Sequence, residues 1–342
     1  MPDYIVTSFY ADAPGEESRY AQVTGMASSS ARFHQVYYRC VAVLMASSRQ
    51  QNPGARHLFV CNRRPLPTVD GVDLGRFLQE RGVELAVLPM TYAPPPGYCS
   101  AWRATFYMLD VVEHLAQLLG PDDTGLVLDC DCLCLRSLQP LSQLIRAHGL
   151  LTYREDYPLA EDINGLSRLS RIPVFEELSG RRITQAPPHV GGELLGLAGS
   201  HAAAFVAALR EVWQEQLRRL TAGRAVLPTE EHLFSYLAWR DALPVGEANR
   251  HCRRVWTSLR HSRARPADLD LALWHLPSEK QAGLRRLWRE LIRGGGPLHG
   301  VPGPDHVAAL ARRCGIPHRG PEKLVRDLVR QLGAHAARRW RG

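Results

Sequence analysis

The stretch from Gly125 to Leu135 reads GLVLDCDCLCL, an apolar run that leads into alternating aspartate and cysteine. Its first four residues are apolar, which predicts a short buried strand. Two sets of metal ligands then compete for the same positions. Asp129 and Asp131 offer oxygen to a hard cation, whereas Cys130, Cys132 and Cys134 offer sulfur to a soft one. Because side chains alternate along a strand, we expect the aspartates to point one way and the cysteines the other.

Similar apolar runs recur along the chain. They are short, rich in branched residues and bounded by glycine, proline or charge, as buried strands of a parallel sheet are. They are Tyr4–Phe9, His57–Cys61, Glu84–Met90 and His189–Leu197. Longer amphipathic runs lie between them, the clearest from Ser100 to Pro121, with Ser100 as the expected N-cap. This alternation predicts an α/β fold with a doubly wound, mostly parallel sheet.

Two other segments bear on the organisation of the chain. The polar connection from Arg154 to Pro188 is long for a compact domain, which is typical of a functional or mobile loop. The glycine-rich stretch Arg293–Pro304 predicts a hinge before a small helical extension. We therefore expect one large domain over residues 1–292 and an extension over residues 293–342.

The net charge of +8 is concentrated toward the end of the sequence. Residues 281–342 carry thirteen arginines or lysines and four acids, a surplus of nine, whereas the rest of the chain sums to about minus one. A basic tail can bind nucleic acid or an anionic membrane, but a solvated helical face is the preferred interpretation. No recognition helix, zinc-finger spacing or aromatic-basic interleaving is found, so nucleic acid is not expected as a partner.

The composition also bears on the expected compartment and source. No apolar run is long enough to cross a bilayer, and the start MPDYIVTSFY lacks the features of a secretory signal. A cytoplasmic location is expected, where the eight cysteines would stay reduced. Only two of the 42 basic residues are lysine, Lys280 and Lys323, which suggests GC-rich coding and a bacterial source.

The choice between sulfur and oxygen ligands favours oxygen. A zinc site would call for four soft ligands, commonly in paired spacing, and the remaining cysteines show no such pairs. Two neighbouring aspartates on one face would repel each other unless a cation joined them, and Mg²⁺ or Mn²⁺ meets that need. A solvated acidic turn remains an alternative, because D-x-D alone is a weak signal.

The order of motifs around the aspartates resembles a known group of enzymes. Over roughly residues 3–290 the chain resembles the metal-dependent glycosyltransferases of the A-type (GT-A) fold. The motifs that carry the resemblance are, in order, a helix with WRATFYMLD, then VLDCDCLCLRSL, GGELLG, TEEHL and WHLPSEKQAG. The resemblance is closest to the retaining branch with the glycogenin-like (family 8) and galactosyltransferase-like families. It implies a Rossmann-like GT-A sheet, Mn²⁺ or Mg²⁺, and a nucleotide-diphosphate sugar donor, with a UDP-sugar preferred. The acceptor would be the hydroxyl of a small molecule or glycan. The GC-rich coding and the lack of a membrane span favour a small molecule, such as a natural-product intermediate. Residues 1–292 would form the nucleotide-sugar-binding and catalytic domain.

The resemblance also implies roles for individual residues. Asp129, Asp131 and His275 would hold the metal, although the spacing from His275 to Lys280 departs by one residue from the family pattern H-x-x-G-x-x-K, and its middle glycine is missing. The residues expected to bind the nucleotide sugar are Ser8, Phe9, Tyr10, Arg103, Asp129, Cys130 and Lys280. Glu230, in TEEHL, and Glu193, after two glycines, are the catalytic candidates. Each has a structural alternative: Glu230 could be a capping charge, His275 a packed ring and Arg103 a surface cation.

Two other functions remain open at this point. A sugar-phosphate nucleotidyltransferase would use a similar sheet, but it would need a glycine-rich basic loop where TSFYADAPGEESRY is acidic. A non-catalytic binder would act through the basic tail. The tail could equally cover the active site or mediate self-association into a homo-oligomer.

Overall fold

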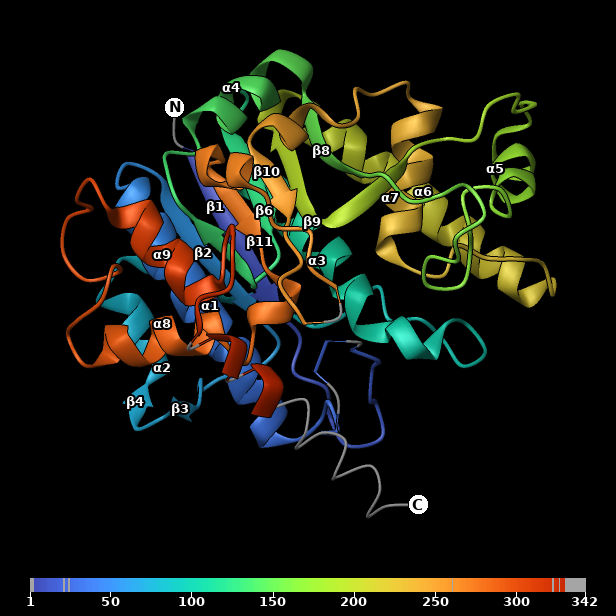
Figure 1. The fold of residues 1–342 in the computed structure, drawn as a ribbon. Helices are drawn as coiled ribbons and strands as arrows, with labels where there is room; N and C mark the ends of the chain where they lie inside the picture. The colour runs from blue at the N-terminus through green and yellow to red at the C-terminus, as the bar shows by residue number, and fades with distance from the viewer. Residues whose placement is uncertain are drawn as a thin grey trace.

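A six-stranded sheet with the strand order β5-β2-β1-β6-β9-β8 forms the centre of the molecule (Figure 1). The computed structural model describes residues 3–20, 22–23, 25–259, 261–321, 323–325 and 327–329. The strands are β1 (Asp3–Phe9), β2 (Arg56–Cys61), β5 (Val83–Val87), β6 (Thr124–Leu128), β8 (Leu150–Glu155) and β9 (His189–Ala198). The first four of the order pair in parallel, whereas β9 is antiparallel to both β6 and β8. The predicted α/β fold with a mostly parallel sheet is therefore confirmed.

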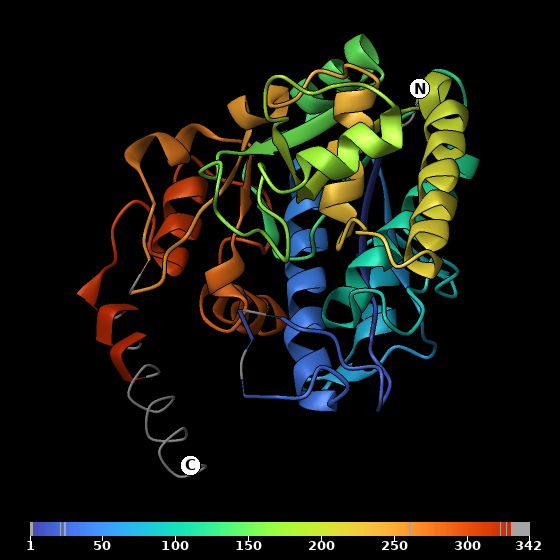
Figure 2. The ribbon, with the colours of Figure 1, turned by 90° about the vertical axis from the view of Figure 1, so that its right-hand side faces the viewer.

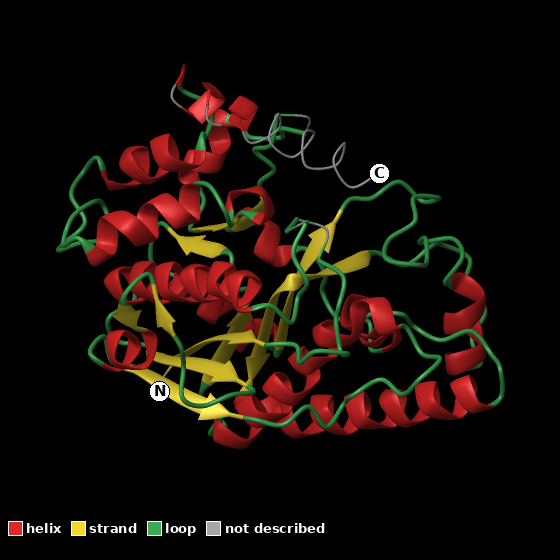
Figure 3. Cartoon of the chain, turned by 90° about the horizontal axis from the view of Figure 1, so that it is seen from below, coloured by secondary structure: helices red, strands yellow, loops and turns green. Residues whose placement is uncertain are grey.

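Helices cover both faces of this sheet (Figures 1 and 3). Strand β2 shows why: Leu58 and Val60 pack in one core cluster, and Phe59 and Cys61 pack in another. On the Phe59 side lie α1 (Ala31–Gln51), α2 (Leu74–Gln79), α8 (Gly283–Ile292) and α9 (His306–Cys314). On the other side lie α3 (Tyr107–Leu118), α5 (Ile172–Ser179), α6 (Gly199–Thr221) and α7 (Glu230–Arg240). Helix α4 (Gln139–His148) packs against β6, β8 and β9. A hairpin of β3 (Thr68–Val69) and β4 (Val72–Asp73) precedes α2.

A second, three-stranded sheet lies beside the carboxyl end of β6. Its strands are β7 (Cys132–Cys134), β10 (Cys252–Arg254) and β11 (Leu273–His275), in the order β10-β11-β7. Strand β11 runs antiparallel to β7, with His275 opposite Cys132. This pairing brings a segment from late in the sequence next to the turn that follows β6.

Some local predictions are wrong in their details. The two aspartates lie in the turn between β6 and β7, outside both strands, because β6 ends at Leu128. The cysteines do not share one face either: Cys130 packs in the cluster around α1, whereas Cys132 and Cys134 pack around β6 and α4. The turn leads the chain from one sheet into the other, so strand alternation does not apply across it.

The predicted helix from Ser100 is divided in two. It begins as a 3-10 helix over Ser100–Phe106, whose N-cap position is Cys99, and continues as α3. The expected N-cap at Ser100 is therefore wrong. The long connection Arg154–Pro188 contains the end of β8 and helix α5, so part of it is regular.

The start of the expected C-terminal extension packs onto the main core. Leu298, Leu310 and Cys314 belong to the same cluster as α1 and α8. Further along, Leu324, Val325, Leu328 and Val329 are exposed. The division at residues 292 and 293 stays a prediction, and the basic residues from 330 to 342 lie outside the described part. Among the described helices, none combines the length and apolarity needed to cross a bilayer.

The junction of β9 and α6 offers a test of the packing. A Cβ atom built at Gly199 would lie 1.8 Å from the backbone oxygen of Gly120, in the segment that leads into β6. Alanine would gain about 1 kcal/mol in helix propensity, but overpacking typically costs about 1–3 kcal/mol and a backbone oxygen cannot move aside cheaply. We expect Gly199→Ala to lower the free energy of unfolding by about 2 kcal/mol, measured by urea denaturation. Gly54→Ala is the control, because a Cβ there would meet nothing within 4 Å.

Candidate metal centre and its cavity

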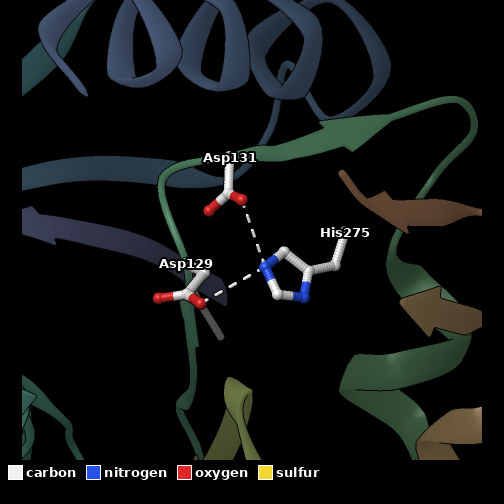
Figure 4. Close-up of side chains that lie close together, drawn as sticks. All are labelled: Asp129, Asp131 and His275. Carbon is white, nitrogen blue, oxygen red and sulfur yellow. Dashed lines mark ion pairs between the residues drawn. The ribbon is translucent and has the colours of Figure 1, made fainter. Parts of the chain in front are cut away.

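Three potential metal ligands converge beyond the end of β6 (Figure 4). One ligand atom from each of Asp129, Asp131 and His275 lies within 4.8 Å of the others. The Nε2 atom of His275 is 3.4 Å from Oδ2 of Asp129 and 3.3 Å from Oδ2 of Asp131. Two carboxylate oxygens and one imidazole nitrogen form a donor set that suits Mn²⁺ and, less well, Mg²⁺. The structure thus brings the three expected ligands together, and their binding of a metal stays a prediction.

Backbone hydrogen bonds fix the turn that carries the aspartates. The amide of Asp129 donates to the carbonyl of Glu193 on β9 at 3.0 Å. The amide of Leu276, just after β11, donates to the carbonyl of Asp131 at 3.0 Å. The turn is thus tied to both sheets, and His275 reaches the aspartates because its strand pairs with β7.

The two aspartates lie in different electrostatic environments. Lys280 and His275 both contact the carboxylate of Asp131, whose side chain is 3% exposed. Burial opposes ionisation of this carboxyl, but the two positive charges outweigh it and hold the pKa of Asp131 well below its usual range. About half of the Asp129 side chain faces the cavity. The protein atoms packed around it nevertheless desolvate this carboxyl and raise the pKa of Asp129 to about 6, against the effect of His275.

Glu193 lies behind the histidine and does not line the cavity. Its Oε1 is 3.4 Å from Nδ1 of His275, and its side chain is fully buried. Burial opposes ionisation, but Arg254 and His275 outweigh it and lower the pKa of Glu193 to about 2. The pKa of His275 is raised to about 9, because Asp131 and Glu193 together outweigh the effect of burial.

Arg254, on β10, is a site residue that the sequence analysis missed. Its guanidinium contacts three buried or half-buried glutamates, Glu155 at 2.9 Å, Glu193 at 2.9 Å and Glu231 at 3.3 Å. It also donates to the hydroxyl of Tyr157 at 3.0 Å. Nothing in HCRRVW distinguishes it from the many other arginines, and its partners come from three distant elements.

A cavity of about 370 Å³ opens above the three ligands. Pockets for small ligands are commonly of this size or larger. Most of the expected nucleotide-sugar residues line it: Ser8, Phe9, Tyr10, Asp129, Cys130 and Lys280. Residues that were not predicted also line it, among them Tyr157, Asn164, Arg254 and Trp256.

Two of the expected nucleotide-binding residues are already engaged within the protein. The ring of Phe9 is stacked on Tyr37, with centroids 5.0 Å apart and an angle of 5°. Arg103 is not among the residues that line the cavity: it donates to the hydroxyl of Tyr10 at 3.1 Å and pairs with Glu16 at 3.2 Å. Direct contact of either residue with a ligand stays a prediction.

Glu230 and Glu231 enter the cavity from the first turn of α7. Glu231 accepts a hydrogen bond from the amide of Gly192 at 2.9 Å and pairs with Arg254 and His189. Although burial opposes ionisation, these contacts hold the pKa of Glu231 well below its usual range. Burial, and then the charge of Glu231, raise the pKa of Glu230 to about 8. Among the described residues, Oε2 of Glu230 has no hydrogen-bond partner. Glycine at position 192 makes room for the Glu230 carboxylate, because a Cβ there would lie 2.8 Å from Oε1 of Glu230.

Solved structures that are similar to this chain are glycosyltransferases. The galactosyltransferase LgtC, in complex with donor and acceptor sugar analogues, is 14% identical, with 80% of this chain and 86% of that chain covered and a TM-score of 0.44. Mouse xyloside xylosyltransferase 1 is 11% identical, with 80% and 97% covered and a TM-score of 0.47. The bifunctional glycosyltransferase WbbM is 8% identical, with 80% and 45% covered and a TM-score of 0.48. No protein-family model and no curated protein matches the sequence. At these scores the similarity assigns no substrate or residue role to this chain.

The raised pKa of Glu230 predicts a pH-dependent stability effect. Between its ordinary pKa near 4.5 and about 8, the folded protein keeps a proton that the unfolded chain releases, so this residue lowers stability as pH rises through that window. Glu230→Gln removes the effect. We expect the Tm of the variant to match that of the wild type near pH 4 and to exceed it by about 3 °C at pH 9, measured by calorimetry. The control is Glu161→Gln, which removes one exposed carboxylate and so separates the effect of burial from the loss of a charge. If the Tm difference from the wild type changed with pH equally in both variants, the raised pKa of Glu230 would be contradicted.

Proposed function

We propose that this protein transfers a sugar from a nucleotide-diphosphate donor, preferably a UDP-sugar, to a hydroxyl group of a small-molecule or glycan acceptor. The observation that carries the proposal is the convergence of Asp129, Asp131 and His275 at the floor of a cavity that also contains a buried lysine. A hard divalent cation and a diphosphate together match this combination of oxygen ligands and ammonium charge. When bound there, Mn²⁺ or Mg²⁺ supplies Lewis-acid stabilisation of the negative charge on the departing diphosphate.

The donor is bound by residues from several elements. Lys280, now paired with Asp131, turns its ammonium toward the diphosphate and adds a compact positive charge there. Ser8, Phe9 and Tyr10, at the end of β1, lie against the base and ribose, with Cys130 beside them on the turn after β6. Arg103 supports this end of the site through its contacts with Tyr10 and Glu16.

Glu230 is the catalytic residue of the proposal. It lines the cavity from a helix N-terminus, and its buried Oε2 has no hydrogen-bond partner among the described residues. Acting as a nucleophile, its carboxylate would form a bond to the anomeric carbon as the bond to the diphosphate breaks, and the acceptor hydroxyl would then displace it and lose its proton. Acting electrostatically, the same carboxylate would stabilise an oxocarbenium-like centre during direct transfer. Both routes require the ionised form, so transfer is expected to increase as pH rises toward 8.

Glu193 is a positioning residue in this scheme. A carboxylate on Nδ1 of a metal-binding histidine fixes the orientation of the ring and leaves Nε2 for the metal. Arg254 in turn balances the charge of Glu193 and of its neighbours Glu155 and Glu231. The acceptor enters from the side lined by Tyr157, Asn164 and Trp256.

Loss of either aspartate should abolish donor binding. We expect Asp129→Asn and Asp131→Asn each to reduce the Mn²⁺-dependent affinity for UDP at least about 100-fold, more than is usual for residues outside the ligand set, measured by isothermal titration calorimetry. Asp156→Asn is the matched control, because Asp156 is exposed and pairs only with Arg154 among the described residues. An unchanged circular dichroism spectrum and a cooperative thermal transition would show that the variants still fold.

Three outcomes would contradict the proposed transfer. The first is the absence of metal-dependent UDP or GDP binding by the wild type. The second is release of pyrophosphate from a nucleoside triphosphate and a sugar phosphate, which would indicate a nucleotidyltransferase. The third is steeply salt-dependent binding to duplex DNA that is lost without residues 297–342, which would indicate a binding protein.

Loss of the carboxylate behind His275 should weaken the metal site without removing a ligand. We expect Glu193→Gln to lower the affinity for Mn²⁺ by about 10–100-fold, measured by calorimetry on protein without nucleotide. A catalytic role for Glu193 predicts a different result, with transfer lost and Mn²⁺ affinity unchanged. A neutral control on the same strand is Leu194→Met, which keeps the packing and leaves the charges in place.

A further inference from the structure

Both lysines of this arginine-rich chain are buried, and both are found at one short segment, Pro277–Lys280: Lys280 ends it, and Lys323 contacts it. Lys280 is 6% exposed and contacts Asp131 in the metal centre. Lys323 is 5% exposed and pairs with Oε1 of Glu279 at 2.9 Å. Glu279 and Lys280 are neighbours in sequence, at the end of the 3-10 helix Pro277–Glu279. A residue from the far end of the chain therefore holds the segment that carries the proposed phosphate-binding lysine.

Lys323 belongs to residues 315–321, 323–325 and 327–329, called here the C-terminal segment. It follows α9 and lies beside the loop that carries Thr257 and the segment that carries Glu279 (Figure 2). Asp327 pairs with Lys323 at 3.0 Å and with Arg319 at 3.8 Å. The charged side of the segment thus faces the body of the protein, while Leu324, Val325, Leu328 and Val329 are exposed.

Arg319 makes a second attachment, to a different wall of the cavity. Its guanidinium donates to the carbonyl of Thr257 at 3.0 Å and to the carbonyl of Ser258. The preceding residues of this wall, Arg254 and Trp256, line the cavity. The C-terminal segment consequently contacts two loops: Arg319 contacts the Thr257–Ser258 loop, and Lys323 contacts the segment with Glu279 and Lys280.

Glu279 joins the two loops. Thr257 donates its hydroxyl hydrogen bond to this carboxylate, and the amide of Gly283 donates to Oε2 at 2.8 Å. The contact is close enough that a Cβ at Gly283 would lie 2.8 Å from Oε2 of Glu279 and 3.0 Å from Sγ of Cys314. Glu279 is only 1% exposed, so without Lys323 it would be a buried carboxylate with no described cation beside it, which is costly.

We propose that Lys323 and Arg319 are positioning residues, which clamp the Glu279–Lys280 segment and the Thr257–Ser258 loop and so hold Lys280 in place for the donor diphosphate. This inference rests on the proposed function for the role of Lys280 but not for the clamp itself. The basic C-terminal region then contributes to donor binding from outside the cavity, without touching the donor. A compact ammonium suits the buried space, because the stem of Lys323 lies against Gly315, where an added Cβ would be 2.5 Å from it.

A double-mutant cycle in UDP binding tests the positioning role. We expect Lys323→Met to weaken Mn²⁺-dependent UDP binding five- to tenfold in calorimetry, and Lys280→Met to weaken it by at least as much. If Lys323 acts through Lys280, the double variant loses no more than Lys280→Met alone, because the two effects are coupled. Independent, additive losses, or wild-type affinity in Lys323→Met, would overturn the proposal. Val329→Ser is the control, because it changes an exposed position of the same segment.

Hydrogen exchange tests the clamp without any ligand. In Lys323→Met we expect the amides of residues 276–282 and 256–258 to exchange at least tenfold faster, while those of β6 and α7 keep their wild-type rates. Unchanged exchange in those two loops would refute the clamp even if UDP binding were altered. Should Lys323→Met fail to fold, Arg319→Met tests the other attachment, with faster exchange expected at 256–258. Failure of the wild type to bind UDP or GDP would contradict the proposed function and leave the exchange result to decide on the clamp.

Discussion

The arrangement of the site depends on the charge balance around Asp131. This carboxylate is almost fully buried, and an unpaired buried charge would be too costly to keep in the folded protein. His275, the last residue of β11, and Lys280, directly after the 3-10 helix Pro277–Glu279, both contact it. His275 is in turn balanced by Glu193. Arg254 continues the alternation of charge to Glu155 and Glu231. Each member is tolerated only because its neighbours carry the opposite sign, so the position of each depends on the others.

This dependence explains which parts of the site were predictable from the sequence. The apolar runs predicted the strands, and Asp129 and Asp131 stood out because acids at the end of such a run call for a cation. His275 was predicted through family resemblance, and the structure brings it to the aspartates. Arg254 was not predictable in the same way. Its three partners lie 23, 61 and 99 positions away in the sequence, and nothing local distinguishes one arginine among 42 basic residues.

The structure differs from the sequence analysis in one point and adds contacts to two others that stay predictions. Strand alternation was carried through Asp129–Cys134, but the chain turns after Leu128 and enters a second sheet, where the facing changes. The role of Glu193 was inferred from its neighbouring glycines, whereas its fully buried side chain turns to His275 and Arg254. The C-terminal region was interpreted mainly as a solvated basic face. Lys323, one of the two lysines of the chain, is instead buried and paired with Glu279.

The contrast between Glu230 and Glu231 carries the argument one step further. They are adjacent in the first turn of α7 and share the favourable end of its dipole. Glu231 accepts a backbone hydrogen bond and lies beside His189 and Arg254, so it stays ionised. Glu230 lines the cavity, its buried Oε2 has no hydrogen-bond partner among the described residues, and burial and then the charge of Glu231 raise its pKa. A carboxylate of this kind is most stabilised when positive charge appears beside it. In the proposed transfer an oxocarbenium-like sugar would provide that charge, and for this reason the proposal gives the catalytic role to Glu230 and not to Glu231.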